Sequence, residues 1–463
     1  MTVVEEAPVV PTRAVGPPSR AVERRRPRRG VADAVLVAGA VGLGASMALP
    51  ISQASIKAVT AAGGLATLAG DVTAMAGTYL LLIMVLLAAR IPALERVMGQ
   101  DRLIRLHRRL SSAPLLLLSA HAVLTTLGYA QAGHIGFWSG AGSLIMTMTW
   151  IFAAVVSYVM MMAIAGVSIR AVRRRLSYDT WWVIHLYTYL ALAFSVPHQI
   201  IDGKSLVGHP LAQSLWTLLW LATAGVVVVY RLMLPIARSL YHRLEIVHVN
   251  VEGPGVYSLV VRGRHLDRLA VAGGQYFGWR FLVRGMWWHA HPFSLSAMPQ
   301  PPYMRVTIKA AGDTTAAITR LRPGTKVAVE GPYGVFTDEA RTRLKVALIG
   351  AGVGVTPLRA LLEDMPSGVD VVVVQRASTR EDLVHNGELA SMVAGRRGRM
   401  VELVGRRFEH RLDDPAYLHH VVPDIATREV FLCGPAGFSS GVARAAGALG
   451  VGPEAIHAES FEF

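Results

Sequence analysis

The chain has little cysteine and little charge. Among its 463 residues there is one cysteine, Cys433, which excludes an intramolecular disulfide and a zinc or iron–sulfur site built from several cysteines. Only 17% of the residues are charged, whereas 52% are hydrophobic. A soluble fold cannot bury that much apolar surface, so part of the chain is predicted to lie in lipid and the rest in the cytosol.

The apolar residues concentrate in the first half of the chain. A membrane span needs about 20 apolar residues to cross a hydrocarbon core roughly 30 Å thick. The run 51–70 contains Lys57 and several glycines, so it is predicted to be a loop. Six stretches are predicted to form a transmembrane helix bundle: 31–50, 72–92, 107–130, 143–168, 181–201 and 213–237.

Arginine placement predicts how the bundle is oriented. Seven arginines precede the first span, five lie between 96 and 109, and four lie between 170 and 175, whereas the opposite loops are almost uncharged. Because cytoplasmic loops collect Lys and Arg, both termini are predicted to face the cytosol from the cell membrane. Residues 1–30 are predicted to be a disordered basic arm that contacts anionic lipid. These loops account for much of the net charge of +15, so no nucleic-acid partner is predicted.

Four histidines stand in two matched pairs on the third and fifth predicted spans. His107 and His121 are fourteen residues apart, and His185 and His198 are thirteen apart. Both spans run in the same direction, so each level of the membrane receives one histidine from each span. The two levels are roughly 20 Å apart at about 1.5 Å per residue, which suits two stacked haems. The alternative is interhelical hydrogen bonding without a metal.

One histidine is out of phase with its partner. Thirteen steps on an ideal helix turn His198 about 140° away from His185. Pro197 precedes His198, and proline can break the hydrogen-bond ladder of a helix. A distortion of the helix at this proline is therefore predicted.

The segments HRRLSSAPLLLLSAH (107–121) and HLYTYLALAFSVPH (185–198) resemble the membrane domain of the ferric reductase and NADPH oxidase superfamily of transmembrane flavocytochromes. The resemblance implies two b-type haems held by the four histidines. It also implies that a ferredoxin-reductase-like module follows, with an FAD-binding β-barrel and then a nicotinamide-nucleotide domain. The predicted domains are the haem-binding membrane domain 31–240, the FAD barrel 241–337 and the NAD(P) domain 338–463.

The region 241–337 has short alternating strands separated by Gly and Pro, which predicts a small antiparallel barrel. It contains HPFSLS (291–296). The resemblance implies that this segment lies along the flavin and that Ser294 hydrogen-bonds its ring. The segment 308–318 matches the part of the family that binds the flavin pyrophosphate, although the family often has tryptophan at the position of Thr314. The implied FAD residues are His291, Pro292, Phe293, Ser294, Lys309, Gly312, Thr314 and Thr315.

From residue 344 the pattern changes to strand, glycine turn and helix, which predicts a parallel α/β domain. Its glycine turn would let backbone amides approach a pyrophosphate at a helix start, and an ordinary tight turn is the alternative. The resemblance places the segment FLCGP (431–435) at the nicotinamide, while a small buried residue is the alternative for the cysteine. The predicted residues are Gly350, Gly352, Gly354, Thr356, Cys433 and Gly434.

Arginines that follow two strands of this domain suggest NADPH in preference to NADH. Arg376 and Arg380 follow one strand, and Arg406 and Arg407 follow the next. Guanidinium groups can bind the 2′-phosphate of NADPH in a bidentate manner. The alternative is solvated loop charge, which leaves NADH possible.

The chain ends with Phe463, which the resemblance places over the flavin and which is otherwise a frayed tail. Phe463, Cys433 and Ser294 are the predicted catalytic residues. The predicted function is electron transfer from cytosolic NAD(P)H through FAD and two haems to an external ferric chelate or dioxygen. The alternative is a transporter or sensor with a regulatory reductase module, against which the lack of acidic residues in the span cores weighs. The oligomeric state is not predicted.

Overall fold

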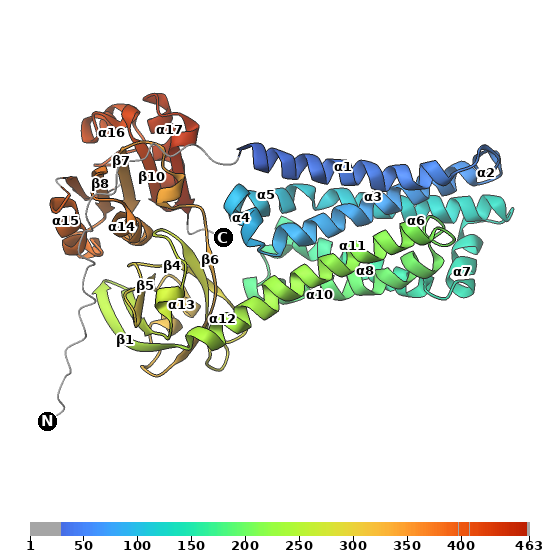
Figure 1. Cartoon of the computed structure of the whole chain (residues 1–463), viewed down its shortest axis with the longest axis horizontal. Coiled ribbons are helices and arrows are strands. Elements are labelled where there is room, and N and C mark those ends of the chain that lie inside the picture. Colours follow the sequence, from blue (N-terminus) through green and yellow to red (C-terminus); the bar gives the residue numbers. More distant parts are fainter. Residues whose placement is uncertain (1–28, 397, 407, 461–463) are drawn as a thin grey trace. The chain divides into compact units, whose positions relative to one another are not determined.

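The computed structural model describes residues 29–460 except 397 and 407. The chain folds into two compact units that meet in sequence between Arg231 and Leu232, and Figure 1 labels their elements. Almost all of the predicted basic arm lies outside the described residues. Arg407 and Phe463 also lie outside them.

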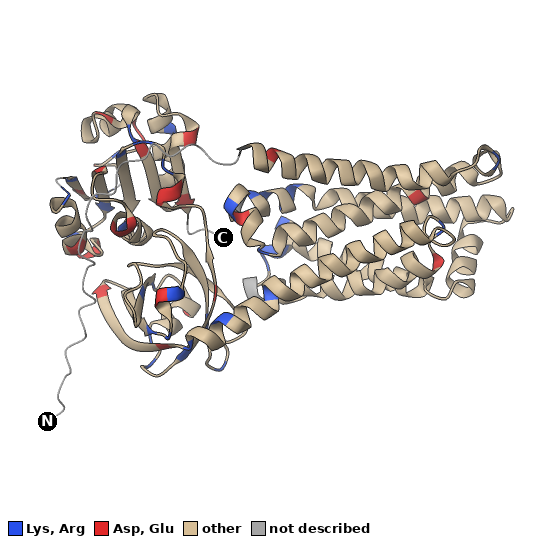
Figure 2. Ribbon diagram, viewed as in Figure 1, with Lys and Arg blue, Asp and Glu red and all other residues tan. Residues whose placement is uncertain are grey.

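The first unit is helical. Five of its described helical stretches are long and apolar enough to cross a membrane: Gly30–Gln53, Gly64–Ala88, Arg102–Ala132, Ile151–Ser168 and Pro210–His242, the last of which continues into the second unit. In Figure 2 most Lys and Arg of this unit gather at the end that carries α4 and α5. The helices are α1 (Arg29–Gln53), α2 (Ile56–Thr60), α3 (Gly64–Ala88), α4 (Pro92–Met98), α5 (Gln100–Leu110), α6 (Ser112–Ala132), α7 (Phe137–Thr147), α8 (Ile151–Ser168), α9 (Arg170–Arg173), α10 (Tyr178–Pro197) and α11 (Pro210–Val227).

The predicted loop 51–70 is wrong from Gly64 onward, because α3 begins there, and it also contains the end of α1 and the short helix α2. The glycines that suggested a loop serve helix packing instead. Gly63, Gly70 and Gly77 recur every seven residues, and a Cβ on each would lie within 3.1 Å of an atom of α6. Small residues at such positions let two membrane helices approach closely. As a result Asp71, predicted to lie in an outer loop, lies inside α3.

The predicted span 143–168 begins too early, because the chain breaks at Met148–Trp150 between α7 and α8 and the apolar helix α8 begins at Ile151. The backbone N–H of Trp150 donates to the carboxylate of Asp202 at 3.2 Å. That carboxylate caps the start of α8, where an acidic group is favourable.

The predicted fifth span corresponds to α10, which packs against α8. This helix is not among the five described stretches named above as long and apolar enough to cross a membrane. It is rich in Trp, Tyr and His, and these side chains are less apolar than the aliphatic residues of the other spans. The five apolar helices agree with five of the six predicted spans in place, although their bounds differ.

The second unit begins with α12 (Leu234–His242) and a six-stranded sheet in which all neighbours are antiparallel. The strand order is β4-β3-β6-β1-β2-β5. A bridge between Leu295 and Val306 joins the end of β4 to β5, the two outermost strands. The elements are β1 (Leu244–Gly253), β2 (Val256–Arg262), β3 (Tyr276–Phe281), β4 (His291–Ser294), β5 (Tyr303–Lys309), α13 (Asp313–Ile318) and β6 (Lys326–Tyr333).

A five-stranded parallel sheet follows, with the order β11-β10-β7-β8-β9, as the α/β pattern predicts. Alternate residues of β7 enter different cores: Val346 and Leu348 pack with α14 and α15, whereas Ala347 and Ile349 pack with α16 and α17. Helices therefore cover both faces. The elements are β7 (Lys345–Ala351), α14 (Val355–Asp364), β8 (Asp370–Ala377), α15 (Asn386–Ala394), β9 (Arg399–Val404), α16 (Pro415–Val421), β10 (Glu429–Gly434), α17 (Ala436–Ala448) and β11 (Ile456–Ser460).

Candidate functional site

The predicted histidine pairs come together in the helical unit. His107 in α5 and His185 in α10 have ring centres 6.3 Å apart, with ring planes at 72°. An ion lies roughly 2 Å from an imidazole nitrogen that binds it, so two rings on opposite sides of one ion have centres about 6 Å apart. The separation of this pair therefore fits a metal ion held between the two rings.

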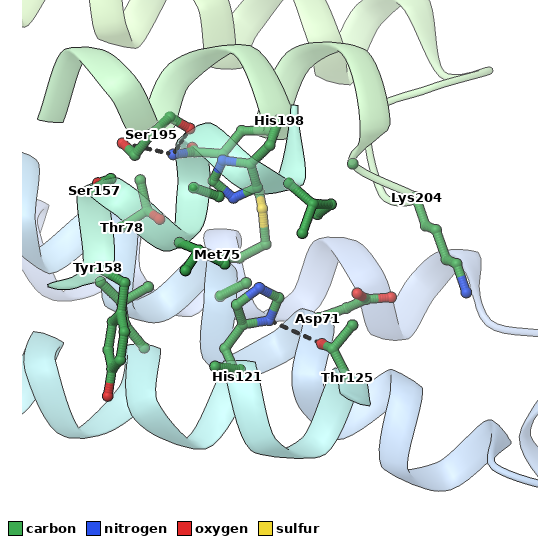
Figure 3. A pocket seen from close by; sticks show the side chains of 18 of the residues that line it. Asp71, Met75, Thr78, His121, Thr125, Ser157, Tyr158, Ser195, His198 and Lys204 are labelled. Carbon is green, nitrogen blue, oxygen red and sulfur yellow. Dashed lines mark hydrogen bonds between the residues drawn. The ribbon is translucent and has the colours of Figure 1, made fainter. Parts of the chain in front are cut away.

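The second pair, His121 in α6 and His198, lines a cavity of about 290 Å³. Figure 3 shows both rings pointing into this cavity from different helices, with Met75 between them. Asp71 and Lys204 line the same cavity. The sequence prediction does not include Asp71 among the site residues, because it starts the second span one residue later, at 72.

His198 begins a π-helical segment, His198–Asp202, directly after Pro197. The predicted distortion at this proline is confirmed. Proline has no N–H to donate and its ring crowds the preceding turn, which favours a change of helical pitch. The side-chain amide of Gln199 donates from Nε2 to the backbone carbonyl of Ser195 at 2.9 Å. This bond satisfies a carbonyl near the altered turn. The wider turn changes the direction in which His198 points.

The two histidines of the third predicted span are held by matching hydrogen bonds. Nδ1 of His107 lies 3.0 Å from the carbonyl oxygen of Met84, and Nδ1 of His121 lies 2.9 Å from that of Gly70. Both carbonyls belong to α3 and are also fourteen residues apart. A ring nitrogen that donates to a carbonyl carries the proton, which leaves Nε2 with a free lone pair. This is the usual arrangement of a metal-binding histidine.

The predicted flavin segment forms β4 and pairs with β3. Opposite partners are Tyr276 with Ser294 and Phe277 with Phe293. The indole N–H of Trp279 donates to the carbonyl of Phe293 at 3.1 Å. Pro292 lies opposite Gly278, and His291 and Ser294 are buried. The structure thus holds these predicted residues on one rigid pair of strands.

The predicted pyrophosphate segment forms the turn between β5 and α13. Lys309 ends β5 and Gly312 precedes the first residue of α13. The hydroxyl of Thr315 accepts hydrogen bonds from the N–H groups of Ala311 and Gly312, at 3.0 Å each. Thr315 therefore shapes the turn, whereas Thr314 is exposed.

The glycine turn after β7 packs against the segment that contains the cysteine. A Cβ on Gly354 would lie 2.4 Å from the carbonyl oxygen of Cys433, whereas Gly352 has φ of +55° and faces open space. Thr356 is buried and its hydroxyl donates to the carbonyl of Val353 at 2.5 Å. Gly350 lies beside Cys433 on the adjacent strand. Gly354 and Gly434 thus share one close backbone contact.

Cys433 is completely buried in the core that α14 and α15 cover. Burial, helped by the nearby Glu459 carboxylate, raises the pKa of its thiol well above the ordinary value. A thiol in such surroundings is not a nucleophile at neutral pH.

A pocket of about 610 Å³ lies at the carboxyl ends of strands β7, β8, β9 and β10. Ala351 and Arg376 belong to the last residues of β7 and β8, and the other lining residues follow the strands. Arg376 and Arg406, which are thirty residues apart in sequence, both line it. Arg376 is held by donating to the carbonyl of Gly405 at 2.9 Å. His410 also lines the pocket, and sequence reasoning missed it. The signal was available, because the ends of parallel strands carry ligand-binding loops.

Comparison with known proteins bears on the helical unit most directly. Residues 73–196 match the family described as ferric reductase like transmembrane component. This stretch is similar to the transmembrane component of that family. The match confirms the resemblance predicted from the paired histidines. His107, His121 and His185 lie within the ferric-reductase-like domain as matched, and His198 lies two residues beyond it.

Two relatives and one solved structure are similar to parts of the chain. An NADPH oxidoreductase of Mycobacterium tuberculosis is 30% identical over 173 residues, which cover 35% of this chain and 45% of that protein. NADPH oxidase 1 of Mus musculus is 34% identical over 80 residues, 16% of this chain and 14% of that protein. The chain therefore spans less than half of either relative. The FAD/NAD-binding domain of a nitric oxide dioxygenase from Vibrio cholerae aligns with 48% of this chain and 98% of that one, at 24% identity and a TM-score of 0.41.

Proposed function

We propose that the chain is a transmembrane oxidoreductase. It would pass electrons from NAD(P)H through FAD and two b-type haems to an acceptor on the other side of the cell membrane. The observation that carries the proposal is the pairing of His107 with His185, at 6.3 Å between ring centres, together with a second pair in one cavity. The ferric-reductase-like domain around them supports it.

The four histidines fit haem better than a bare metal ion. No cluster of three or more His, Cys, Asp or Glu in the described part of the chain could hold an ion by itself. Each pair supplies two imidazoles, which is the number of axial ligands that a haem iron takes, and the porphyrin supplies the rest. We assign His107 and His185 to an inner haem, and His121 and His198 to an outer one.

The proposed topology needs α10 as a sixth span, with both termini in the cytosol. Its length of 20 residues is sufficient for a crossing. The arginines of loops 96–109 and 170–175 support the cytosolic side at that end, because such loops retain Lys and Arg inside. The same assignment puts the inner pair at the arginine-rich end.

In the second unit, which we call the reductase unit, FAD would be held by β3, β4 and the turn before α13. The pocket lined by Arg376 and Arg406 would hold the adenosine part of NADPH, with NADH as a second donor. Bound flavin would accept two electrons from the nicotinamide and release them singly, which is why it must stand between a hydride donor and a haem. The protein's own residues bind and orient these groups. Cys433 and Gly434 would lie next to the nicotinamide, since they pack against the glycine turn.

The acceptor is proposed to be a ferric chelate or dioxygen. The alternative of a transporter gains one argument, because Asp71 lies inside a span and lines the outer cavity. Intramembrane acidic residues often mark transport pathways. The two histidine pairs favour electron transfer over this alternative.

The test is the anaerobic visible spectrum of the detergent-purified chain before and after NADPH addition, with flavin and haem quantified. We expect two haems per chain with b-type bands that become reduced. His121→Ala should remove one haem, whereas the control His134→Ala, in the loop after α6, should retain both. A wild-type protein without haem would overturn the proposal.

A further inference from the structure

The two histidines of the inner pair are held in different ways. Nδ1 of His107 has the carbonyl oxygen of Met84 at 3.0 Å. Nδ1 of His185 is buried and has no hydrogen-bond partner among the described residues. A metal-binding histidine nearly always donates its second nitrogen to a carbonyl, carboxylate or water, and this bond fixes the orientation of the ring. Something else must therefore orient His185.

Trp181 supplies the missing contact. Its ring stacks on the ring of His185, with centres 5.1 Å apart and planes at 22°. The two residues are one turn apart on α10, where residues four apart lie on the same face. The indole N–H of Trp181 donates to the hydroxyl of Ser168 at 3.2 Å, and that hydroxyl donates to the carbonyl of Ile164 at 2.8 Å. The indole is thus fixed to α8 and can hold the imidazole plane.

A positive charge adjoins this stack. The guanidinium carbon of Arg173 lies 4.3 Å from the centre of the Trp181 ring, which is the geometry of a cation–π contact. Arg173 belongs to the arginine-rich stretch 170–175 that the sequence places on the cytosolic side. Because it contacts the tryptophan that stacks on His185, its charge is held near the inner pair.

We infer that Trp181 and Arg173 are positioning residues for His185, an inference that rests on the proposed haem-binding function. Trp181 sets the plane of the imidazole, which stands at 72° to the plane of His107. Arg173 holds Trp181 in place and adds a positive charge. Reduction adds one negative charge at the bound group, and a nearby cation stabilises that charge. The stack of Arg173, Trp181 and His185 thus favours transfer of an electron to the inner haem.

The experiment uses the full-length chain in detergent and five variants, two of which are matched controls. Trp181→Leu removes the stack, and Trp181→Phe keeps an aromatic ring. Arg173→Gln removes the charge. Trp182→Leu removes the neighbouring indole from the same helix, and Arg174→Gln removes a neighbouring charge from the same loop. The readouts are haem content, the low-spin ferric electron paramagnetic resonance spectrum, whose largest g value reports the angle between axial imidazole planes, and the midpoint potential of each haem.

We expect Trp181→Leu to shift the largest g value of one haem, or to lose that haem, and Trp181→Phe, which keeps a ring but loses the bond to Ser168, to shift it less. Arg173→Gln should lower the midpoint potential of one haem by more than Arg174→Gln does. Trp182→Leu should match the wild type. The inference is overturned if Trp181→Leu binds two haems with unchanged g values and potentials, or if the Trp181 and Trp182 variants lose haem equally. Wild-type protein without haem would instead refute the proposed function itself.

Discussion

Arg305 and Glu388 are joined by two parallel hydrogen bonds. Nη1 and Nη2 of the arginine donate to the two carboxylate oxygens at 2.8 Å each. Arg305 lies in β5 of the antiparallel sheet, and Glu388 lies in α15 of the parallel-sheet domain. Glu388 also accepts from Nε of Arg359 at 2.7 Å. One carboxylate thus fastens the two sheets of the reductase unit together.

Removal of this carboxylate should destabilise the reductase unit. Glu388→Ala would leave Arg305 and Arg359 without the acceptor, and charged hydrogen bonds contribute about 1.5–3 kcal/mol each. Since the Glu388 side chain is 31% exposed, water can replace part of the loss, and we expect a decrease of roughly 2–4 kcal/mol in the free energy of unfolding. A urea titration of the detergent-solubilised chain measures it. Glu381→Ala, an exposed acid in the same segment, should leave the transition unchanged, and an equal shift in both variants would contradict the assignment.

The same network should make stability depend on pH through His385. This side chain is fully buried, with Nε2 2.9 Å from the Thr307 hydroxyl and Nδ1 3.3 Å from Glu388 and 3.5 Å from Glu252. Burial lowers the pKa of His385, against the opposing effect of the two carboxylates, and the charge of Arg305 adds to the lowering. Because the unfolded state then binds more protons, stability is present above about pH 6.5 and falls as the pH decreases below that value.

Unfolding midpoints between pH 7 and pH 5 test this dependence. His385→Gln should flatten the curve, whereas the exposed His419→Gln should retain the wild-type slope. Glu388 acts at lower pH: burial raises its pKa, but hydrogen bonds from His385 and Arg305 outweigh burial and hold the pKa well below the ordinary value. Its contribution is therefore lost only below about pH 4. A wild-type curve that is flat down to pH 5 would contradict the role of His385.

The pocket lined by Arg376 and Arg406 should decide nucleotide preference. One charge-assisted hydrogen bond to a phosphate contributes about 1.5–3 kcal/mol, or roughly 10- to 100-fold. Arg406→Ala should raise the KM for NADPH by that factor and change the KM for NADH little. Arg380→Ala is the matched control, because Arg380 follows β8, the strand that contains Arg376, but does not line the pocket. Equal effects on both nucleotides would refute the assignment.

Cys433 should resist thiol reagents in the folded protein. It is fully buried, and burial raises the pKa of its thiol. Since it is the only cysteine of the chain, labelling of the whole protein reports on this one site. Iodoacetamide at pH 8 should leave the native chain unmodified and modify the denatured chain fully. Rapid labelling of native protein would show that β10 opens.

The fold class of the reductase unit could be predicted from the sequence. Alternation and Gly–Pro spacing predicted the antiparallel strands, and the strand–turn–helix pattern predicted the parallel sheet, because both patterns report which face of a strand is buried. Arg376 and Arg406 could be named as candidates because they come at the ends of two predicted strands. Their meeting in one pocket depends on the order of β8 and β9 in the sheet, which local pattern does not specify.

The helical unit shows more clearly what the sequence alone cannot predict. Composition indicated that the chain enters a membrane, and the spacing of His107, His121, His185 and His198 predicted two levels of paired histidines, because helix rise follows from residue number alone. The direction of His198 depended on the π-helical segment that follows Pro197. The tertiary structure decided what holds those rings. The close approach of α3 and α6 through glycines brings the carbonyl of Gly70 to His121, α8 brings Ser168 to the tryptophan beneath His185, and the early start of α3 puts Asp71 beside the outer pair. These contacts join residues far apart in the chain, and only packing determines which of them meet.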